Sequence, residues 1–310
     1  MTTINFKKLF SIKDIKEEVG FPNSIESIKL GYDHNLYILL KQEEPERIIR
    51  GIASFPNTEA DTKYIAIILT IDWDHHLVIN KRIITLGHLK MNYSILQPLD
   101  DEFLIVGLRC RNLPEGPELN AMIFDEKGSI VREFCLGDGI TEALTIPDKK
   151  IITGYFDEGI LGNFGWSDPI GKCGIIQWDK DGNQIWKNTT QTMYDVFGMD
   201  YFKNKLYYNI GELIETNMEN EEKVIKMKGV NSCLKFTFSK DEKKLIVDGF
   251  IENNSLYIYD FGEEIPKNKR KAEFLFDGNK INDIENVNVI NLRESKIICK
   301  YNDFIYGTKF

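Results

Sequence analysis

The sequence has little of what would point to a membrane protein or a nucleic-acid-binding protein. Its longest apolar run, YIAIILTI from Tyr64, falls well short of the ~20 residues that span a bilayer. The first residues contain no apolar segment of secretory length and no small-residue cleavage site. Lys and Arg number 39 against 48 Asp and Glu, and no basic stripe is present to match phosphates. We therefore expect neither a membrane nor a nucleic acid as partner.

Cysteine is also too sparse to form a framework. The chain has five cysteines, an odd number, with wide spacing and no C-x-x-C motif. They are Cys110, Cys135, Cys173, Cys233 and Cys299. This pattern predicts neither a set of disulfides nor a zinc site. It is typical of small buried side chains in a reducing compartment, so we expect the protein to be cytoplasmic.

What the sequence does contain is a weak internal repeat of short apolar runs. Six runs recur about every 52 residues, which is a period typical of repeat folds. They are LYILL from Leu36, FLIVGL from Phe103, IITGYF from Ile151, LYYNIG from Leu206, LIVDGF from Leu245 and IICKYN from Ile297. Consecutive apolar, β-branched and aromatic residues predict strands covered on both faces. Polar turns such as PLDDE and YFKNK precede the runs, and a further strand follows each.

This order predicts an all-β fold, a six-bladed β-propeller with four-stranded blades, formed by residues 1–310 as one domain. The last copy ends one strand short, and residues 4–12 alternate in the manner of an outer strand. We expect this N-terminal strand to complete the last blade and close the ring, which would remove an exposed sheet edge. Helical periodicity is weak, with a single turn indicated near residues 13–19.

Three connections after the second strands are long, spanning residues 41–63, 109–119 and 156–172. Long connections are where function is most often placed on a repetitive scaffold. The third, which begins YFDEGILGNFGW, combines several glycines with acids and aromatics. The binding candidates on the last two are Arg109, Arg111, Asp157, Glu158, Asn163, Trp166 and Asp168. Trp166 decides between two interpretations: exposed, it anchors a partner; buried, it makes the loop a structural plug.

The same loop carries a resemblance. The segments YFDEGILGNFGW, PIGKCGIIQWDKDGN and MYDVFGMDYFKNKLYYNI are similar to the central part of a family of uncharacterised bacterial propeller-like proteins. The similarity covers residues 137–210 well and the rest through the blade pattern alone. It implies the fold and assigns no residue a role.

Metal and catalytic motifs are weak. DWDHHL from Asp72 groups acids with histidines, and WDKDGN from Trp178 resembles part of a calcium loop. Both occupy the position of a hairpin turn in the repeat, so no cofactor is expected. Carboxylates on inner strands or between blades could nonetheless converge on a central channel and hold Ca²⁺ or another divalent cation, as in metal-dependent lactonases. The candidates are Glu26, Asp138, Glu142, Asp195 and Asp283.

Two functions remain open from the sequence. The first is a non-enzymatic propeller that binds a protein with the half of one face formed by the long loops. The alternative is a hydrolase or lyase acting on a small ligand in the central funnel, with or without a bound divalent cation. Three or more carboxylates converging on the channel would favour the enzyme, whereas an apolar plug beneath an exposed aromatic patch would favour the binding protein.

Overall fold

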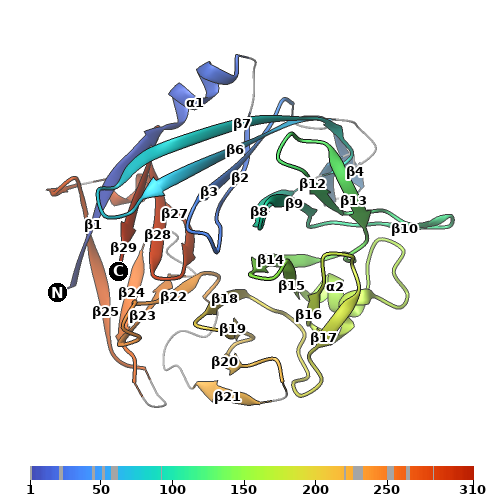
Figure 1. Ribbon diagram of the computed structural model, residues 1–310. Helices are drawn as coiled ribbons and strands as arrows, with labels where there is room; N and C mark the ends of the chain where they lie inside the picture. The colour runs from blue at the N-terminus through green and yellow to red at the C-terminus, as the bar shows by residue number, and fades with distance from the viewer. Residues whose placement is uncertain are drawn as a thin grey trace.

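Strands dominate the structure. The computed structural model describes residues 2–20, 24–43, 46–50, 53–56, 62–91, 93–219, 221–225, 233–249, 255–262, 266–281 and 283–310. Strands account for 57% of the residues and helices for 7%, which confirms the all-β prediction. The sheets follow one another around a common centre in chain order (Figure 1). The result is a propeller-like arrangement of four-stranded antiparallel sheets.

Four of these sheets are separate units in which each strand pairs with the next along the path. The first contains β2 (Ser24–Leu30), β3 (Leu36–Lys41), β6 (Thr62–Asp72) and β7 (Leu77–Leu89). The second contains β8 (Ser94–Leu99), β9 (Glu102–Gly107), β12 (Ala121–Phe124) and β13 (Ile130–Phe134). The third contains β14 (Ile140–Ile146), β15 (Lys150–Tyr155), β16 (Ile175–Trp178) and β17 (Gln184–Lys187). The fourth contains β18 (Gly198–Phe202), β19 (Lys205–Asn209), β20 (Leu213–Thr216) and β21 (Glu222–Ile225).

The remaining large sheet is one path in the order β22-β23-β24-β25-β1-β29-β28-β27, with β26 paired to β25. Its strands are β22 (Phe236–Phe238), β23 (Lys244–Asp248), β24 (Leu256–Asp260), β25 (Lys267–Phe276), β26 (Asn279–Lys280), β1 (Thr2–Ser11), β29 (Phe304–Lys309), β28 (Lys296–Tyr301) and β27 (Val287–Arg293). Two small hairpins occur in long connections: β4 (Arg47–Arg50) with β5 (Ala53–Pro56), and β10 (Asn112–Leu113) with β11 (Gly116–Pro117). The helical segments are α1 (Ile12–Val19), α2 (Asp157–Leu161), and the 3₁₀ turns η1 (Ile170–Cys173) and η2 (Ile284–Asn286).

The six apolar runs of the repeat form β3, β9, β15, β19, β23 and β28. Each pairs with the strand before it and with the next strand of its sheet, so each is a second strand, as predicted. In β3 every residue is buried, and Leu36, Leu39 and Leu40 have no exposed surface. Both faces of such a strand lie against neighbouring sheets, which accounts for apolar residues in succession.

The first strands of the repeat units lie innermost and contact one another in sequence. β2 contacts β8, β8 contacts β14, and the contacts continue through β18 and β22 to β27, which returns to β2. The first strands therefore form a closed circuit around the common centre (Figure 1).

The N-terminal strand β1 lies between the last two groups of strands. Thr2 to Phe6 pair in parallel with β25, and Lys7 to Ser11 pair antiparallel with β29. Ile4 and Phe6 are buried there beside aromatic side chains of β25. The strand ends one residue earlier than the predicted 4–12, because Ser11 Oγ accepts the N–H of Asp14 and starts helix α1.

Candidate functional site

The long connections gather at one end of the sheets. The first strands run in the same direction, since groups near their carboxyl ends form hydrogen bonds with one another. The connections of each sheet therefore alternate between two ends of the molecule. One end, the turn end, carries the tight turns between first and second strands and between third and fourth strands. The other, the loop end, carries the second-to-third connections and the links between sheets. Of the predicted loop 41–63, residues 44–45, 51–52 and 57–61 lie outside the described part of the chain.

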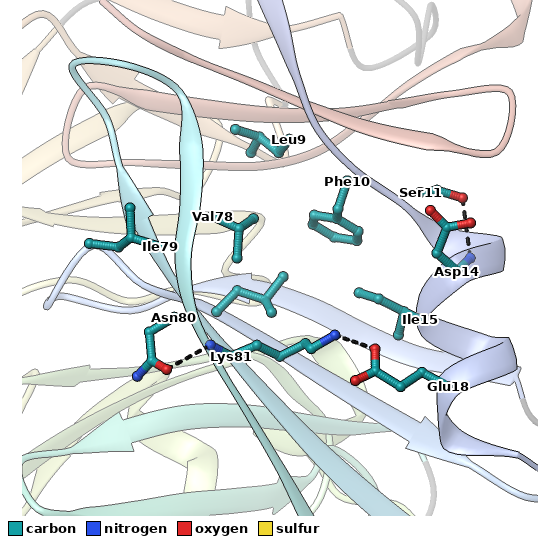
Figure 2. A pocket seen from close by; sticks show the side chains of 11 residues that line it. Leu9, Phe10, Ser11, Asp14, Ile15, Glu18, Val78, Ile79, Asn80 and Lys81 are labelled. Carbon is teal, nitrogen blue, oxygen red and sulfur yellow. Dashed lines mark hydrogen bonds and ion pairs between the residues drawn. The ribbon is translucent and has the colours of Figure 1, made fainter.

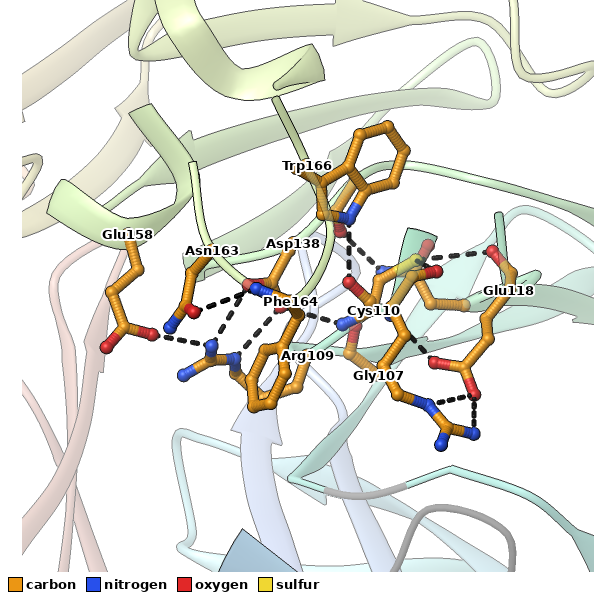
Figure 3. A network of polar contacts seen from close by, with 12 residues as sticks. Gly107, Arg109, Cys110, Glu118, Asp138, Glu158, Asn163, Phe164 and Trp166 are labelled. Atoms are coloured by element: carbon orange, nitrogen blue, oxygen red, sulfur yellow. Dashed lines mark hydrogen bonds and ion pairs between the residues drawn. The ribbon is translucent and has the colours of Figure 1, made fainter. Parts of the chain in front are cut away.

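Arg109 is the centre of a polar network at the loop end (Figure 3). Its guanidinium donates to both carboxylate oxygens of Asp138, at 2.9 and 3.0 Å, and lies 2.5 Å from Glu158. The ring of Phe164 covers the guanidinium, with its centroid 4.2 Å away. The Asp138 side chain is 1% exposed, and such a buried carboxylate is stable only with a paired cation. The network therefore joins the link before β14 to both described long loops.

The two loops are also joined through their backbones. The Cys110 N–H donates to Asp138 at 2.8 Å, and the Cys110 carbonyl accepts the Trp166 Nε1–H at 2.8 Å. The Asn112 N–H donates to the Phe164 carbonyl at 2.9 Å. Gly165 has a φ of +87°, and a Cβ there would lie 2.3 Å from the Asn112 carbonyl oxygen, so this close approach requires glycine.

Trp166 is therefore folded back rather than presented outward. It is 9% exposed and points toward Cys110 (Figure 3). The interpretation of Trp166 as an exposed partner anchor is wrong, because three glycines let the loop turn inward and the buried indole finds a carbonyl acceptor. With Trp166 buried, the loop 156–172 has the folded-back form of the structural-plug interpretation.

Replacement of Trp166 by alanine should lower the free energy of unfolding by ~3–5 kcal/mol through cavity formation. The substitution also leaves the buried Cys110 carbonyl without its donor. Urea unfolding followed by circular dichroism measures the change. Tyr194→Ala is the control, because Tyr194 is 67% exposed and its loss should cost less than ~0.5 kcal/mol. A Trp166→Ala loss no larger than that of the control would contradict the burial described.

The other binding candidates of these loops make local contacts. Arg111 pairs with Glu118 at 2.5 Å across the β10–β11 hairpin. Asp157 accepts the Glu158 N–H at the start of α2, and Asn163 accepts the Phe164 N–H. Asp168 pairs with Lys172 at 2.7 Å on the surface. These candidates thus shape their own loops.

The two channel candidates on inner strands form ion pairs with lysines. Glu26 is 2.5 Å from Lys41, and both side chains are nearly buried. Lys29 donates to both oxygens of Glu142 at 2.8 Å, which bridges β2 to β14. Glu26 and Glu142, the candidates on inner strands, are therefore each paired with a lysine of the chain. Asp138, the candidate in the link before β14, is likewise paired with a cation, Arg109.

The two remaining channel candidates lie in links between sheets. Burial, and secondarily the charge of Asp157, raise the pKa of Asp195. Asp283 accepts the Tyr301 hydroxyl at 2.7 Å, and this hydrogen bond lowers the pKa of Asp283. Among the described residues, no group of three or more His, Cys, Asp or Glu side chains is placed to hold a metal ion.

The two motifs that resemble metal sites are hairpin turns. In DWDHHL, the Asp72 carboxylate accepts the N–H groups of Asp74 and His75 and lies 2.8 Å from the His75 ring. In WDKDGN, Asp179 accepts the N–H groups of Asp181 and Asn183. The side-chain oxygens that would bind a cation thus organise the turns, as the repeat predicted.

Sequence reasoning missed a second polar network, at the turn end, that crosses the common axis. Arg293 on β27 is 2% exposed. It donates to the Leu30 carbonyl and to Gln97 Oε1 at 2.9 Å, and to the Thr145 carbonyl at 2.5 Å. These acceptors belong to β2, β8 and β14, so one guanidinium joins four first strands.

The other two first strands, β18 and β22, form hydrogen bonds beside this network. Thr237 on β22 donates to the fully buried Asp200 on β18 at 2.9 Å and accepts the Ser295 N–H. Burial raises the pKa of Asp200 well above its usual range. The signal in the sequence was a polar residue near the end of five first strands, where the repeat predicts apolar character.

Described residues line two hollows. A cavity of about 450 Å³ lies between β2, β8 and β27 and is lined by Glu26, Lys29, Asn288, Lys300 and apolar side chains such as Ile95 and Ile290. A groove of about 490 Å³ runs between α1 and β7 on the outside, bordered by the Glu18–Lys81 ion pair (Figure 2). In the described part of the chain, no helix has the length and apolar character needed to cross a bilayer.

Comparisons with known proteins find overall similarity only among solved structures. No family model matches the chain, and no curated protein matches it. A chain in the crystal structure of a mitotic checkpoint complex has a TM-score of 0.47 at 6% identity, covering 92% of this chain and 89% of that one. Apo AztD from Citrobacter koseri has a TM-score of 0.43 at 10% identity, covering 88% and 79%. Both scores are too low to carry an argument about function.

Proposed function

We propose that the chain is a six-bladed propeller closed by its N-terminal strand, related to the bacterial family that the sequence resembles. The closed circuit of first strands and the pairing of β1 with β29 support this. On this view β27, β28, β29 and β1 are the four strands of the last blade.

The proposed function is non-enzymatic binding of a protein by the loop end. The observation that carries it is the distribution of exposed large apolar side chains. Among the described residues, those outside the outermost strands all lie in connections of the loop end. They are Ile49, Tyr93, Leu119, Leu161, Tyr194, Leu234 and Ile284. Apolar side chains held on rigid loops are typical of protein interfaces.

The rigidity of the loops supports the same function. The Arg109 network and the buried Trp166 hold 109–119 and 156–172 as one body, so binding costs little loop ordering. Leu161 on α2 is 65% exposed, and Tyr194, in the link after β17, is 67% exposed. These two side chains come from connections of the same sheet and are the strongest anchor candidates.

The alternative is a hydrolase or lyase using the cavity between β2, β8 and β27. The volume of about 450 Å³ is large enough for a small ligand. A divalent cation bound there would have to displace the Glu26–Lys41 and Glu142–Lys29 ion pairs. Those pairs favour the binding function over cation-assisted hydrolysis.

The test is capture of a partner by wild-type protein and by a Leu161→Glu, Tyr194→Glu double variant. Partners recovered from a native extract are identified by mass spectrometry, then produced and titrated by calorimetry. We expect the double variant to bind at least ~10-fold more weakly, because desolvated anchors typically contribute more than ~1.4 kcal/mol. Its melting temperature should be unchanged, since both side chains are exposed.

Ile185→Glu is the matched control, because Ile185 is 48% exposed on the outer strand β17. This variant should bind as the wild type does. Equal affinity of wild type and double variant would overturn the assignment to the loop end. Weakening by Ile185→Glu alone would place the interface on the outer strands instead.

A further inference from the structure

Two cysteines at the loop end have their thiols in contact. Cys110 Sγ lies 3.7 Å from Cys135 Sγ, and no other pair of thiols in the described residues is this close. Cys110 follows the second strand of the second sheet, and Cys135 follows β13, the fourth strand of that sheet. Their proximity is thus created by the fold, across 25 residues of chain.

The two thiols differ in their surroundings. Cys110 is 1% exposed, with its Sγ 3.2 Å from the Glu118 carbonyl oxygen, whereas Cys135 is partly exposed and accepts the Gly137 N–H at 3.3 Å. The Cys110–Cys135 contact is the chief cause that lowers the pKa of Cys135, and the same contact raises the pKa of Cys110. Cys135 is therefore the accessible thiol that ionises first.

The charges around the pair are already balanced. Arg109 is held by Asp138 and Glu158, and Arg111 by Glu118. The Cys110 backbone is fixed on both sides by Asp138 and Trp166. Closing the pair to the ~2.05 Å of a disulfide requires a shift of about 1.7 Å.

We propose that Cys110 and Cys135 form a peroxide-sensitive dithiol, with Cys135 as the attacking thiol and Cys110 as the resolving one. The Cys135 thiolate attacks one oxygen of hydrogen peroxide, the O–O bond breaks, and the hydroxide released takes the proton lost by Cys135 and leaves as water. Cys135 is now a sulfenic acid. The Cys110 sulfur attacks it, the S–O bond breaks, and hydroxide leaves with the Cys110 proton as a second water. Two thiols lose two electrons to one peroxide.

This proposal does not rest on protein binding at the loop end, since it concerns thiol chemistry alone. The test treats the reduced full-length protein with hydrogen peroxide, blocks the remaining thiols under denaturing conditions, and maps peptides by mass spectrometry. We expect two fewer alkylated thiols and a single cross-link between Cys110 and Cys135. Wild-type protein suffices for this readout, so it does not depend on how a variant folds.

Variants then assign the order of attack. With Cys110→Ser, a sulfenic acid should accumulate on Cys135 and react with dimedone; with Cys135→Ser, Cys110 should stay reduced. Cys173→Ser is the control and should keep the cross-link, because Cys173 has no thiol neighbour among the described residues. Absence of the cross-link in folded wild-type protein, or its appearance only after unfolding, would overturn the proposal. Dimedone labelling of Cys110 in place of Cys135 would reverse the assigned roles.

Discussion

Deletion of residues 2–11 is expected to abolish cooperative unfolding of the monomer. The strand β1 is paired on both sides, so its loss opens the edges of β25 and β29 together. It also removes Ile4 and Phe6 from a cluster of buried aromatics. Each buried side chain contributes ~2–3 kcal/mol and each hydrogen bond ~1 kcal/mol. The free energy lost with β1 is therefore comparable to the ~5–15 kcal/mol that stabilises a typical domain.

Size-exclusion chromatography with light scattering and thermal circular dichroism measure the result. The truncated chain should be aggregated or oligomeric, because two unpaired edges beside uncovered phenylalanines favour pairing between molecules. A peptide of residues 1–11 added in trans should restore part of the monomer. Thr3→Ala, on the exposed face of β1, is the control and should behave as the wild type does. A truncated monomer that melts at the wild-type temperature would contradict the role of β1 as the closing strand.

Arg293→Met is expected to lower the free energy of unfolding by about 3 kcal/mol or more. The substitution keeps most of the side-chain volume but removes the buried hydrogen bonds to the Leu30 and Thr145 carbonyls and one of the two hydrogen bonds to Gln97 Oε1. Each buried acceptor left unpaired costs ~1–3 kcal/mol, part of which is offset because a buried charge is also removed. It also removes the positive charge that favours ionised Asp200.

Equilibrium urea unfolding measures this loss. Arg132→Met is the matched control, because Arg132 pairs with Asp181 at 2.7 Å on the surface, with side chains 35% and 46% exposed. That pair should contribute less than ~1 kcal/mol. If the two arginine variants lost similar amounts, the axial network would contribute no more than a surface ion pair.

The second strands were predictable because burial on two faces leaves a direct signal. Runs such as LYILL and FLIVGL have few polar positions, and turn residues bound them. The sequence also predicted that the N-terminal residues form a strand, and β1 pairs with β25 and β29. Helix α1 was indicated only as a single turn near residues 13–19, because an eight-residue helix capped by Ser11 has little periodicity of its own.

The site was harder to predict than the fold. Candidates such as Asp138 and Trp166 were recognised by residue type, but their partners come from other loops, and a single sequence does not state such pairings. Trp166 was left undecided because glycines permit either direction. The sequence did not predict a role for Arg293, because an arginine beside a turn is usually solvent-exposed. Its burial follows only from the meeting of first strands at the axis.

The pairing of β1 with β29 also sets an order of events during synthesis. Lys7 pairs with Gly307, so strand β1 leaves the ribosome long before its antiparallel partner exists. At ~5–20 residues per second, 300 residues take roughly 15 to 60 s to translate. Throughout that interval the β29-facing edge of the nascent chain is open, and the final sheet is assembled last. A chaperone that shields the amino-terminal segment during translation would therefore act at the step where this chain is most exposed to misassembly.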